Sequence, residues 1–283
     1  MTKIIFSTES GADIPTDLAQ VYNFQIVPMH VIMEGTDYLD GFLPVEKIYD
    51  YYRRTKKIPS TTSTNTYEYT DFFAGIKRDI PDCVIIHIGY TSRASSSFQN
   101  AVLAVEDFDD IFLIDALNVS GGLAAVVLHA GRLLKDKPEI EPEELIAEIE
   151  AAVPKSRLSF IPGSLDFLRA GGRVSNAAYI SGSLLKIKPM IELIDGKLVS
   201  TKKYRGHINR VSVRLFQDYL KQYDIERDYL YFLYTLGLDE NIQHRITKMA
   251  EENGFRNIRW IEAGAVISTH AGPGAFGIAG LEK

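Results

Sequence analysis

The most constraining feature of the sequence is the run Cys83–Gly89, in which both alternating faces are largely apolar. A strand of this kind is typical of a parallel sheet buried between two layers of helices. Shorter β-type runs at Lys3–Ser7 and Ile111–Asp115 alternate with helical patterns at Ala94–Glu106 and Gly121–Lys135. This alternation predicts an α/β fold whose N-terminal part has a mainly parallel sheet with helices on both faces.

Three further segments of the first half have recognisable patterns. Ala12–Tyr22 is predicted as a short helix, and Val45–Arg54 has helical spacing with its apolar residues on one side. Phe24–Met33 is rich in β-branched and apolar residues, which predicts a single strand.

The pattern changes after about residue 155, where hairpin and helix signals are mixed. Asp195-Gly196 separates two β-type runs, Pro189–Ile194 and Lys197–Tyr204, and this dipeptide predicts a two-residue hairpin. We therefore expect two domains, an α/β domain over 1–155 and an α+β domain over 156–283. Helices are expected at His207–Tyr223 and Glu240–Asn253, and strands at Tyr229–Leu236, Asn257–Glu262 and Ala265–Ser268.

Composition excludes several classes of protein. The formal net charge of −6 over 283 residues disfavours broad binding to nucleic acid phosphates. The single cysteine, Cys83, excludes an internal disulfide framework and a cysteine-based zinc cluster. Because neither a secretory signal pattern nor an apolar run of membrane-spanning length is present, we expect a cytoplasmic protein without a transmembrane segment.

Familiar catalytic and cofactor motifs are missing from the sequence. There is no Walker-A loop, no G-x-S-x-G elbow and no H-E-x-x-H motif, and G-x-G-x-x-G does not follow the first strand. The chain offers hydroxyl-rich loops without an activated nucleophile. This pattern favours a binding protein that needs no cofactor.

Two loops are rich in hydroxyl side chains. Pro59–Thr66 holds six hydroxyl residues and no charge, and Thr91–Gln99 follows the predicted buried strand and opens a helix. Hydroxyls and helix-start amides can bind a carboxylate or a phosphate, although the same residues equally serve as helix N-caps. Two such loops in one parallel-sheet domain favour a shared site for an oxygen-bearing ligand at the carboxyl edge of the sheet.

Two glycine-rich segments carry the remaining candidates. In Leu168–Ser175, paired glycines allow close approach, and Arg173 could pair with an anion or tie the two halves of the chain together. In Thr269–Gly277, His270 is expected to follow a short strand and to open a tight Gly-Pro-Gly loop. Isolated histidines are usually structural, but this placement makes His270 a candidate functional residue.

Taken together, these motifs resemble those of the DegV family of bacterial fatty-acid-binding proteins, in the same order and over essentially the full length. Glu9 stands where the family has Asp, and Ser96 and Ser97 stand where Gly-Thr is typical. The matching segments are Glu9–Asp13, Pro59–Asn65, Ser92–Ala101, Asp115–Gly122, Leu168–Arg173, Leu185–Pro189, Asp195–Lys197, Arg205 and Thr269–Ala275.

The resemblance implies a carrier and not a catalyst. Such a protein binds one long-chain fatty acid in a buried tunnel between its domains and presents it to a separate fatty acid kinase, which makes the acyl phosphate with ATP. Two alternatives stand beside this interpretation. One is a small-molecule phosphotransfer or hydrolase enzyme with His270 as general base, and the other is an interaction module with neither ligand nor turnover.

The resemblance also implies which residues surround the carboxylate. Thr61 and Ser95 would hydrogen-bond it, and Thr62 is the alternative to Thr61, although the spacing from Pro59 favours Thr61. The polar surround, part of which could face the kinase, would be formed by His270, Arg205 and Arg173.

Overall fold

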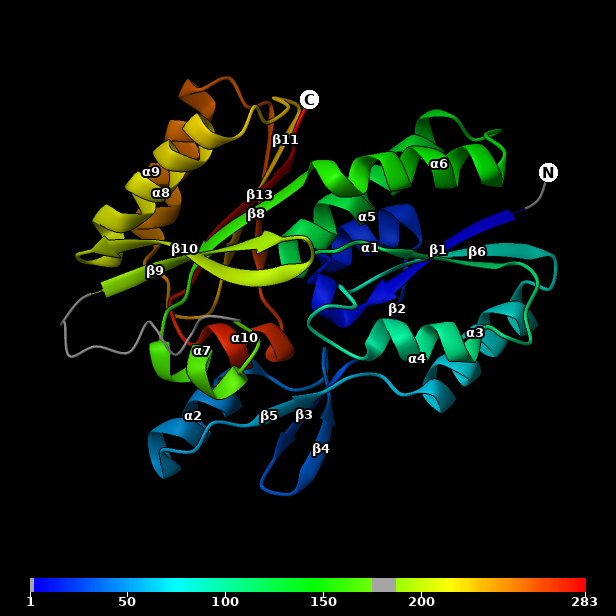
Figure 1. Cartoon of the computed structure of the whole chain (residues 1–283), viewed down its shortest axis with the longest axis horizontal. Helices are drawn as coiled ribbons and strands as arrows, with labels where there is room; N and C mark the ends of the chain where they lie inside the picture. Colours follow the sequence, from blue (N-terminus) through cyan, green and yellow to red (C-terminus); the bar gives the residue numbers. More distant parts are fainter. Residues whose placement is uncertain (1–2, 175–186) are drawn as a thin grey trace.

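The computed structural model describes residues 3–174 and 187–283, and its strands form three sheets (Figure 1). The four-stranded sheet is parallel throughout, and all seven residues of its strand β6 are buried, which confirms the α/β prediction. In spatial order its strands are β2 (Gln25–Val27), β1 (Lys3–Glu9), β6 (Cys83–Gly89) and β7 (Ile111–Asp115).

Helices cover both faces of this sheet. On one face, Ile85 of β6 packs into a cluster with α3 (Thr66–Asp79) and α4 (Ser97–Ala104). On the other face, Ile86 packs into a cluster with α5 (Ser120–Asp136). The doubly apolar pattern of β6 therefore arises because neighbouring side chains enter two different cores.

The second sheet has six strands and mixed direction. β11 and β12 are parallel, whereas the other neighbouring pairs are antiparallel. The spatial order is β10 (Lys197–Arg205), β9 (Ile187–Ile194), β8 (Ser156–Ile161), β13 (Phe276–Leu281), β11 (Tyr229–Tyr234) and β12 (Asn257–Glu262). Two helices, α8 (Ile208–Gln222) and α9 (Glu240–Glu252), pack on it at the side away from the first sheet (Figure 1).

Helix α5 lies between the two larger sheets. It contacts β1 and β6 on one side and β8, β11 and β13 on the other. Every residue from Ser120 to Leu128 is buried, as expected for a helix that is apolar all round. A Cβ on Gly121 would lie 2.5 Å from the Leu233 side chain, so the helix meets the second sheet at a glycine.

The predicted strand Phe24–Met33 is wrong as a single element. Gln25–Val27 forms β2 of the parallel sheet, whereas His30–Met33 forms β3 of a separate three-stranded antiparallel sheet. Pro28 lies between them, and because proline has no N–H it cannot continue a hydrogen-bonded ladder. The small sheet has the order β4 (Thr36–Leu39), β3 and β5 (Ser60–Thr62).

The predicted strand Ala265–Ser268 is also wrong, because this segment begins helix α10 (Ala265–Ala271). Its first amides are capped by two distant carboxylates. Asp13 accepts from the Gly264 amide at 2.8 Å, and Asp40 accepts from the Ala265 and Val266 amides at 2.8 and 3.2 Å. The capping groups lie more than 200 residues away in the sequence, so no local pattern indicates this helix.

The remaining predicted elements have the expected type. Asp195 and Gly196 have φ angles of +49° and +77°, as a two-residue primed hairpin turn requires. Helices α1 and α4 are shorter than predicted. The other elements are η1 (Ser10–Ala12), α1 (Thr16–Tyr22), α2 (Val45–Thr55), α6 (Pro142–Ala152), η2 (Val153–Lys155) and α7 (Leu165–Gly171).

The division into domains at 155/156 stays a prediction. The strands of the six-stranded sheet begin at Ser156, which agrees with the change of pattern in the sequence. The largest apolar cluster, however, includes residues from both sides of this point. Within residues 3–174 and 187–283, no helix is both long enough and apolar enough to cross a membrane.

Candidate functional site

An apolar cavity, partly open to solvent, lies where α5, α7, α10 and the six-stranded sheet meet. Its walls include Leu158 and Phe160 of β8, Leu168 of α7, Leu233 of β11 and Ile267 of α10. Its polar lining side chains are Tyr90, Ser120, Arg173, Tyr234, Thr235 and His270.

His270 lies in the last turn of α10 and not in a loop after a strand, as the sequence had indicated. Its Nε2 atom is 2.8 Å from Oγ1 of Thr61 on β5, so the structure brings these two predicted site residues together. Its Nδ1 atom is buried and has no hydrogen-bond partner in the part of the chain that is described. Burial and the nearby Arg173 charge lower the pKa of His270 to about 4, so the ring is neutral at neutral pH.

The paired glycines bring Arg173 and His270 together. A Cβ on Gly171 would lie 2.3 Å from Nδ1 of His270, so only glycine permits this approach. Gly172 ends α7 with a φ angle of +65°, in the left-handed region. The guanidinium of the exposed Arg173 then donates to the Gly171 carbonyl at 2.7 Å, and its side chain lines the cavity.

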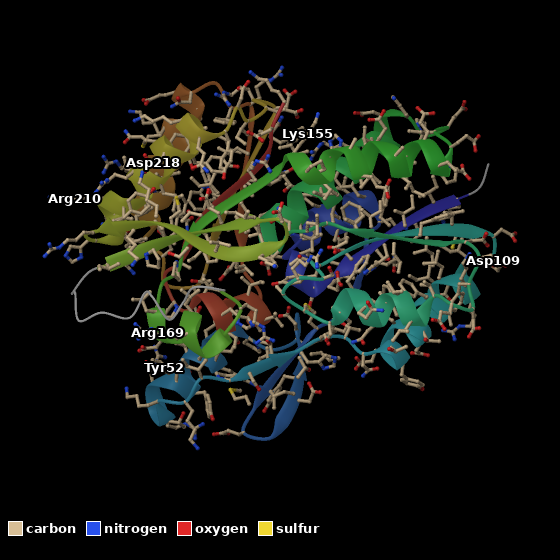
Figure 2. The ribbon with its side chains drawn as sticks, in the orientation of Figure 1. Tyr52, Asp109, Lys155, Arg169, Arg210 and Asp218 are labelled. Atoms are coloured by element: carbon tan, nitrogen blue, oxygen red, sulfur yellow. The ribbon has the colours of Figure 1, made fainter. Side chains whose placement is uncertain are left out.

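Helix α7 is held in place by α2. The Tyr52 hydroxyl donates to Asp166 at 3.1 Å, and the Tyr52 and Phe167 rings pack edge to face with centroids 4.9 Å apart. Figure 2 shows Tyr52 and Arg169 at this junction between the two helices. The backbone that carries the paired glycines is therefore anchored on the side away from the cavity.

Thr61 and Thr62 point in opposite directions, because neighbouring residues of a strand lie on opposite faces. Thr61 is partly buried and contacts His270, whereas Thr62 is exposed. Between the two candidate threonines, the geometry therefore places Thr61 at the histidine.

The two hydroxyl-rich loops also meet, although not through the residues that the resemblance selects. Ser63 and Ser96 lie 2.9 Å apart between their hydroxyl oxygens. Ser95 accepts a hydrogen bond from the Ser97 amide at 3.1 Å, which is a helix-start contact. Ser95 is not among the residues that line the cavity.

The capping interpretation of the first loop is confirmed at its end. Asn65 accepts from the Glu68 amide, and the Glu68 side chain accepts from the Asn65 amide, in a capping box that begins α3.

Arg205, the last residue of β10, is exposed and does not line the cavity. The geometry therefore places Arg173, and not Arg205, at the cavity.

Sequence reasoning missed Tyr90, whose side chain lines the cavity and is 8% exposed. Its position could have been found by extending the alternation of β6. Ile86 and Ile88 belong to the core on the α5 side, and Tyr90 follows in the same two-residue period.

A second polar cluster lies near the cavity but does not line it. Glu9 is fully buried, with its carboxylate 2.7 Å from the Tyr69 hydroxyl, 2.8 Å from the Tyr90 amide and 3.6 Å from Nε2 of His87. Burial alone would raise the pKa of Glu9, but the His87 charge and the hydrogen bonds outweigh it and lower the pKa. This cluster joins β1 to the end of β6.

A metal site is not indicated in the described parts of the chain. Over residues 3–174 and 187–283, no group of three or more His, Cys, Asp or Glu side chains is arranged to hold a metal ion. The cavity polar groups are hydroxyls, a neutral imidazole and a guanidinium, which suit an anionic organic ligand better than a cation.

The chain is similar to proteins of one family over its whole length. The model of the DegV family matches residues 2–283. A DegV domain-containing protein of Caldanaerobacter subterraneus is 31% identical over 289 residues, which cover all of both chains. A fatty acid-binding protein of Thermotoga maritima is 25% identical over 99% of both chains.

A solved structure supports the same assignment at the level of the fold. A DegV family protein from Thermus thermophilus, described for its fatty acid binding, superposes with a TM-score of 0.88 at 23% identity, with all of both chains covered. The predicted arrangement of a parallel sheet with flanking helices and a further α+β part is therefore confirmed. Because the family model spans nearly every residue, the chain belongs to the DegV family.

Proposed function

We propose that this chain binds a long-chain fatty acid, with the acyl chain in the apolar cavity and the carboxylate at its polar mouth. The observation that carries this proposal is that neutral His270 and the exposed Arg173 line an otherwise apolar cavity, and that His270 is paired with Thr61, which lies outside the lining itself. The relatives that are named as fatty acid-binding proteins support the same ligand class.

The apolar walls supply the affinity. Removing roughly 15 methylenes from water at ~0.8 kcal/mol each gives about 12 kcal/mol of gross free energy. Association and ordering costs reduce this figure considerably. The head group therefore needs to be positioned more than it needs to be bound tightly.

We further propose that the protein presents the carboxylate to a fatty acid kinase. One carboxylate oxygen would attack the γ-phosphorus of ATP and ADP would leave, which yields the acyl phosphate. Neutral donors such as the Thr61 hydroxyl leave the oxygen more nucleophilic than a full ion pair in a buried site would. Ser95 and Arg205 stay predicted participants in this step.

The geometry gives less support to an enzyme that uses His270 as general base. A catalytic histidine that activates a hydroxyl is normally oriented by a third group on its other nitrogen. Among the described residues, Nδ1 of His270 has no such partner, and a pKa of about 4 makes the ring a weak base at neutral pH. The Thr61–His270 pair therefore suits binding better than proton transfer.

The test begins with the purified protein. Denaturing extraction followed by mass spectrometry should find close to one fatty acid per chain. Thr61→Ala should slow acyl-phosphate formation by an added fatty acid kinase, and Thr62→Ala serves as the matched control. Absence of lipid, together with no binding of added hexadecanoic acid, would contradict the proposed ligand; equal rates for both variants would contradict the role of Thr61.

A further inference from the structure

The Tyr90 hydroxyl is a polar group on an apolar wall. Its ring is fixed in place: a Cβ on Gly11 would lie 3.1 Å from it, and the Tyr90 amide donates to Glu9 at 2.8 Å. More than nine-tenths of the residue is buried, yet it lines the cavity. Within residues 3–174 and 187–283, no hydrogen bond to this hydroxyl is found.

The other polar side chains of the cavity already have protein partners. Ser120 donates to Asp13, Tyr234 donates to Glu262 at 3.1 Å, and Thr235 donates to the Gly272 carbonyl at 2.6 Å. Arg173 donates to the Gly171 carbonyl, and His270 is paired with Thr61 through Nε2, whereas its Nδ1 atom has no partner among the described residues. Tyr90 is therefore the hydroxyl-bearing residue of the cavity whose hydroxyl has no hydrogen-bond partner in the described part of the chain.

Tyr90 acts as a hydrogen-bond donor over the whole physiological pH range. Burial, followed by the nearby Asp13 carboxyl, raises the pKa of its phenol above the ordinary value and outweighs the Arg173 charge, which lowers it, so the O–H stays protonated. A plain hydrocarbon chain beside it would cover the hydroxyl and leave this donor without an acceptor, which costs free energy. A ligand that brings an oxygen to this point removes that cost.

Tyr90 is less exposed than the cavity residues that we assign to the carboxylate. Arg173 is exposed and His270 is partly exposed, whereas Tyr90 is 8% exposed. A carboxylate held at Thr61, His270 and Arg173 would extend its acyl chain into the cavity whose wall includes Tyr90. On this placement, the Tyr90 donor meets the acyl chain close to the head group.

On the basis of the proposed function, we infer that Tyr90 makes this cavity selective for fatty acids that carry a hydroxyl or oxo oxygen on the acyl chain. A donor that a ligand covers favours a ligand with an acceptor oxygen at that point over one without it. The plain acid still binds through its methylenes, and the oxygenated acid binds more tightly.

The test compares acids that differ only in this oxygen. The delipidated full chain is titrated by displacement of a fluorescent fatty acid with hexadecanoic acid and with its 2-hydroxy, 3-hydroxy and 12-hydroxy forms. At least one hydroxy acid should bind with an affinity at least about fivefold higher than that of hexadecanoic acid. Tyr90→Phe should abolish that preference and leave hexadecanoic acid bound as tightly or more tightly.

A matched control lies on the same cavity wall. Tyr234→Phe removes a hydroxyl that already donates to Glu262, so it should leave the preference unchanged. Equal weakening of every acid in Tyr90→Phe would make Tyr90 a carboxylate ligand and overturn the inference. If the wild-type protein prefers none of the hydroxy acids, the inference about Tyr90 is overturned. If no acid binds at all, the proposed function itself is contradicted.

Discussion

Two histidine clusters with opposite properties lie on either side of Tyr90. His87 has the Ser7 hydroxyl 3.0 Å from Nδ1 and the Glu9 carboxylate 3.6 Å from Nε2, and it is fully buried. His270 has the Thr61 hydroxyl 2.8 Å from Nε2, no partner for Nδ1 among the described residues, and a guanidinium nearby. Both clusters contain a histidine and a hydroxyl.

The difference lies in where the charge is balanced. The anion of the first cluster is Glu9, which the protein supplies, so this cluster has its own carboxylate, although Nε2 of His87 has no hydrogen-bond partner among the described residues. The second cluster has a neutral ring, a hydroxyl and the cation of Arg173, with no carboxylate of its own in the contacts described. A ligand carboxylate would supply the anion that this cluster lacks. Both clusters contain a group with a shifted pKa, so the shift alone does not tell which cluster binds a ligand.

The largest effect is expected at the cluster of Glu9 and His87. Glu9→Ala would leave the Tyr90 amide without its acceptor, and it would remove the carboxylate that accepts from the Tyr69 hydroxyl and lies 3.6 Å from Nε2 of His87. We expect the free energy of unfolding to fall by about 3–5 kcal/mol, measured by urea denaturation. Glu9→Gln should lose less, because it keeps an acceptor oxygen. A loss under about 1 kcal/mol would show that the cluster does not stabilise the fold.

The cluster of His270 should respond in binding more than in stability. Gly171→Ala places a Cβ where Nδ1 of His270 lies, so the ring must move and fatty acid affinity should fall by about tenfold, at a stability cost of about 1–3 kcal/mol. Gly172→Ala is the control, since it strains a positive φ but meets no atom within 4 Å. Equal affinity losses in both variants would mean that His270 is not the cause.

The pH dependence of stability should also identify His270. Its folded pKa of about 4 lies below the ordinary 6.5, so the unfolded chain binds the proton first as the pH falls. The free energy of unfolding should therefore decrease from pH 6.5 to 4, by about 1 kcal/mol from this group once its partial exposure is considered. The delipidated wild type and His270→Asn are compared by urea unfolding at both pH values, and the variant should lose less stability between pH 6.5 and 4. An equal loss in both proteins would contradict the assignment to His270.

The smallest effect compares the neighbouring threonines. Thr61→Val removes the hydroxyl at His270, and we expect fatty acid affinity to fall about fivefold in the displacement titration. Thr62→Val changes the exposed face of the same strand and should leave the affinity unchanged. A larger loss in Thr62→Val would reverse the assignment made from the geometry.

Strands with a strong local pattern could be predicted from the sequence. Cys83–Gly89, Ile111–Asp115 and Asn257–Glu262 have the predicted bounds, because each is a short segment of apolar or alternating residues with a clear strand pattern. Elements that depend on contacts with distant residues could not be predicted from the sequence. Helix α10 depends on Asp13 and Asp40, which no window around Gly264 contains.

The site was predictable in part for the same reason. Thr61, Arg173 and His270 are indicated by motifs, but their proximity depends on β5 and the end of α7 both lying against α10. The close approach of Gly171 to His270 cannot be read from glycines alone. Tyr90 was missed because a tyrosine after an apolar strand has the pattern of an ordinary core residue.

The position of β13 has a consequence for how this protein is made. Phe276–Leu281 forms an inner strand, paired with β8 on one side and β11 on the other. On the ribosome, a nascent chain that has not yet released this segment has two separate halves of the sheet with exposed edges. Phe276 and Gly277 also line the cavity, so the cavity wall is complete only after nearly all of these 283 residues have been synthesised.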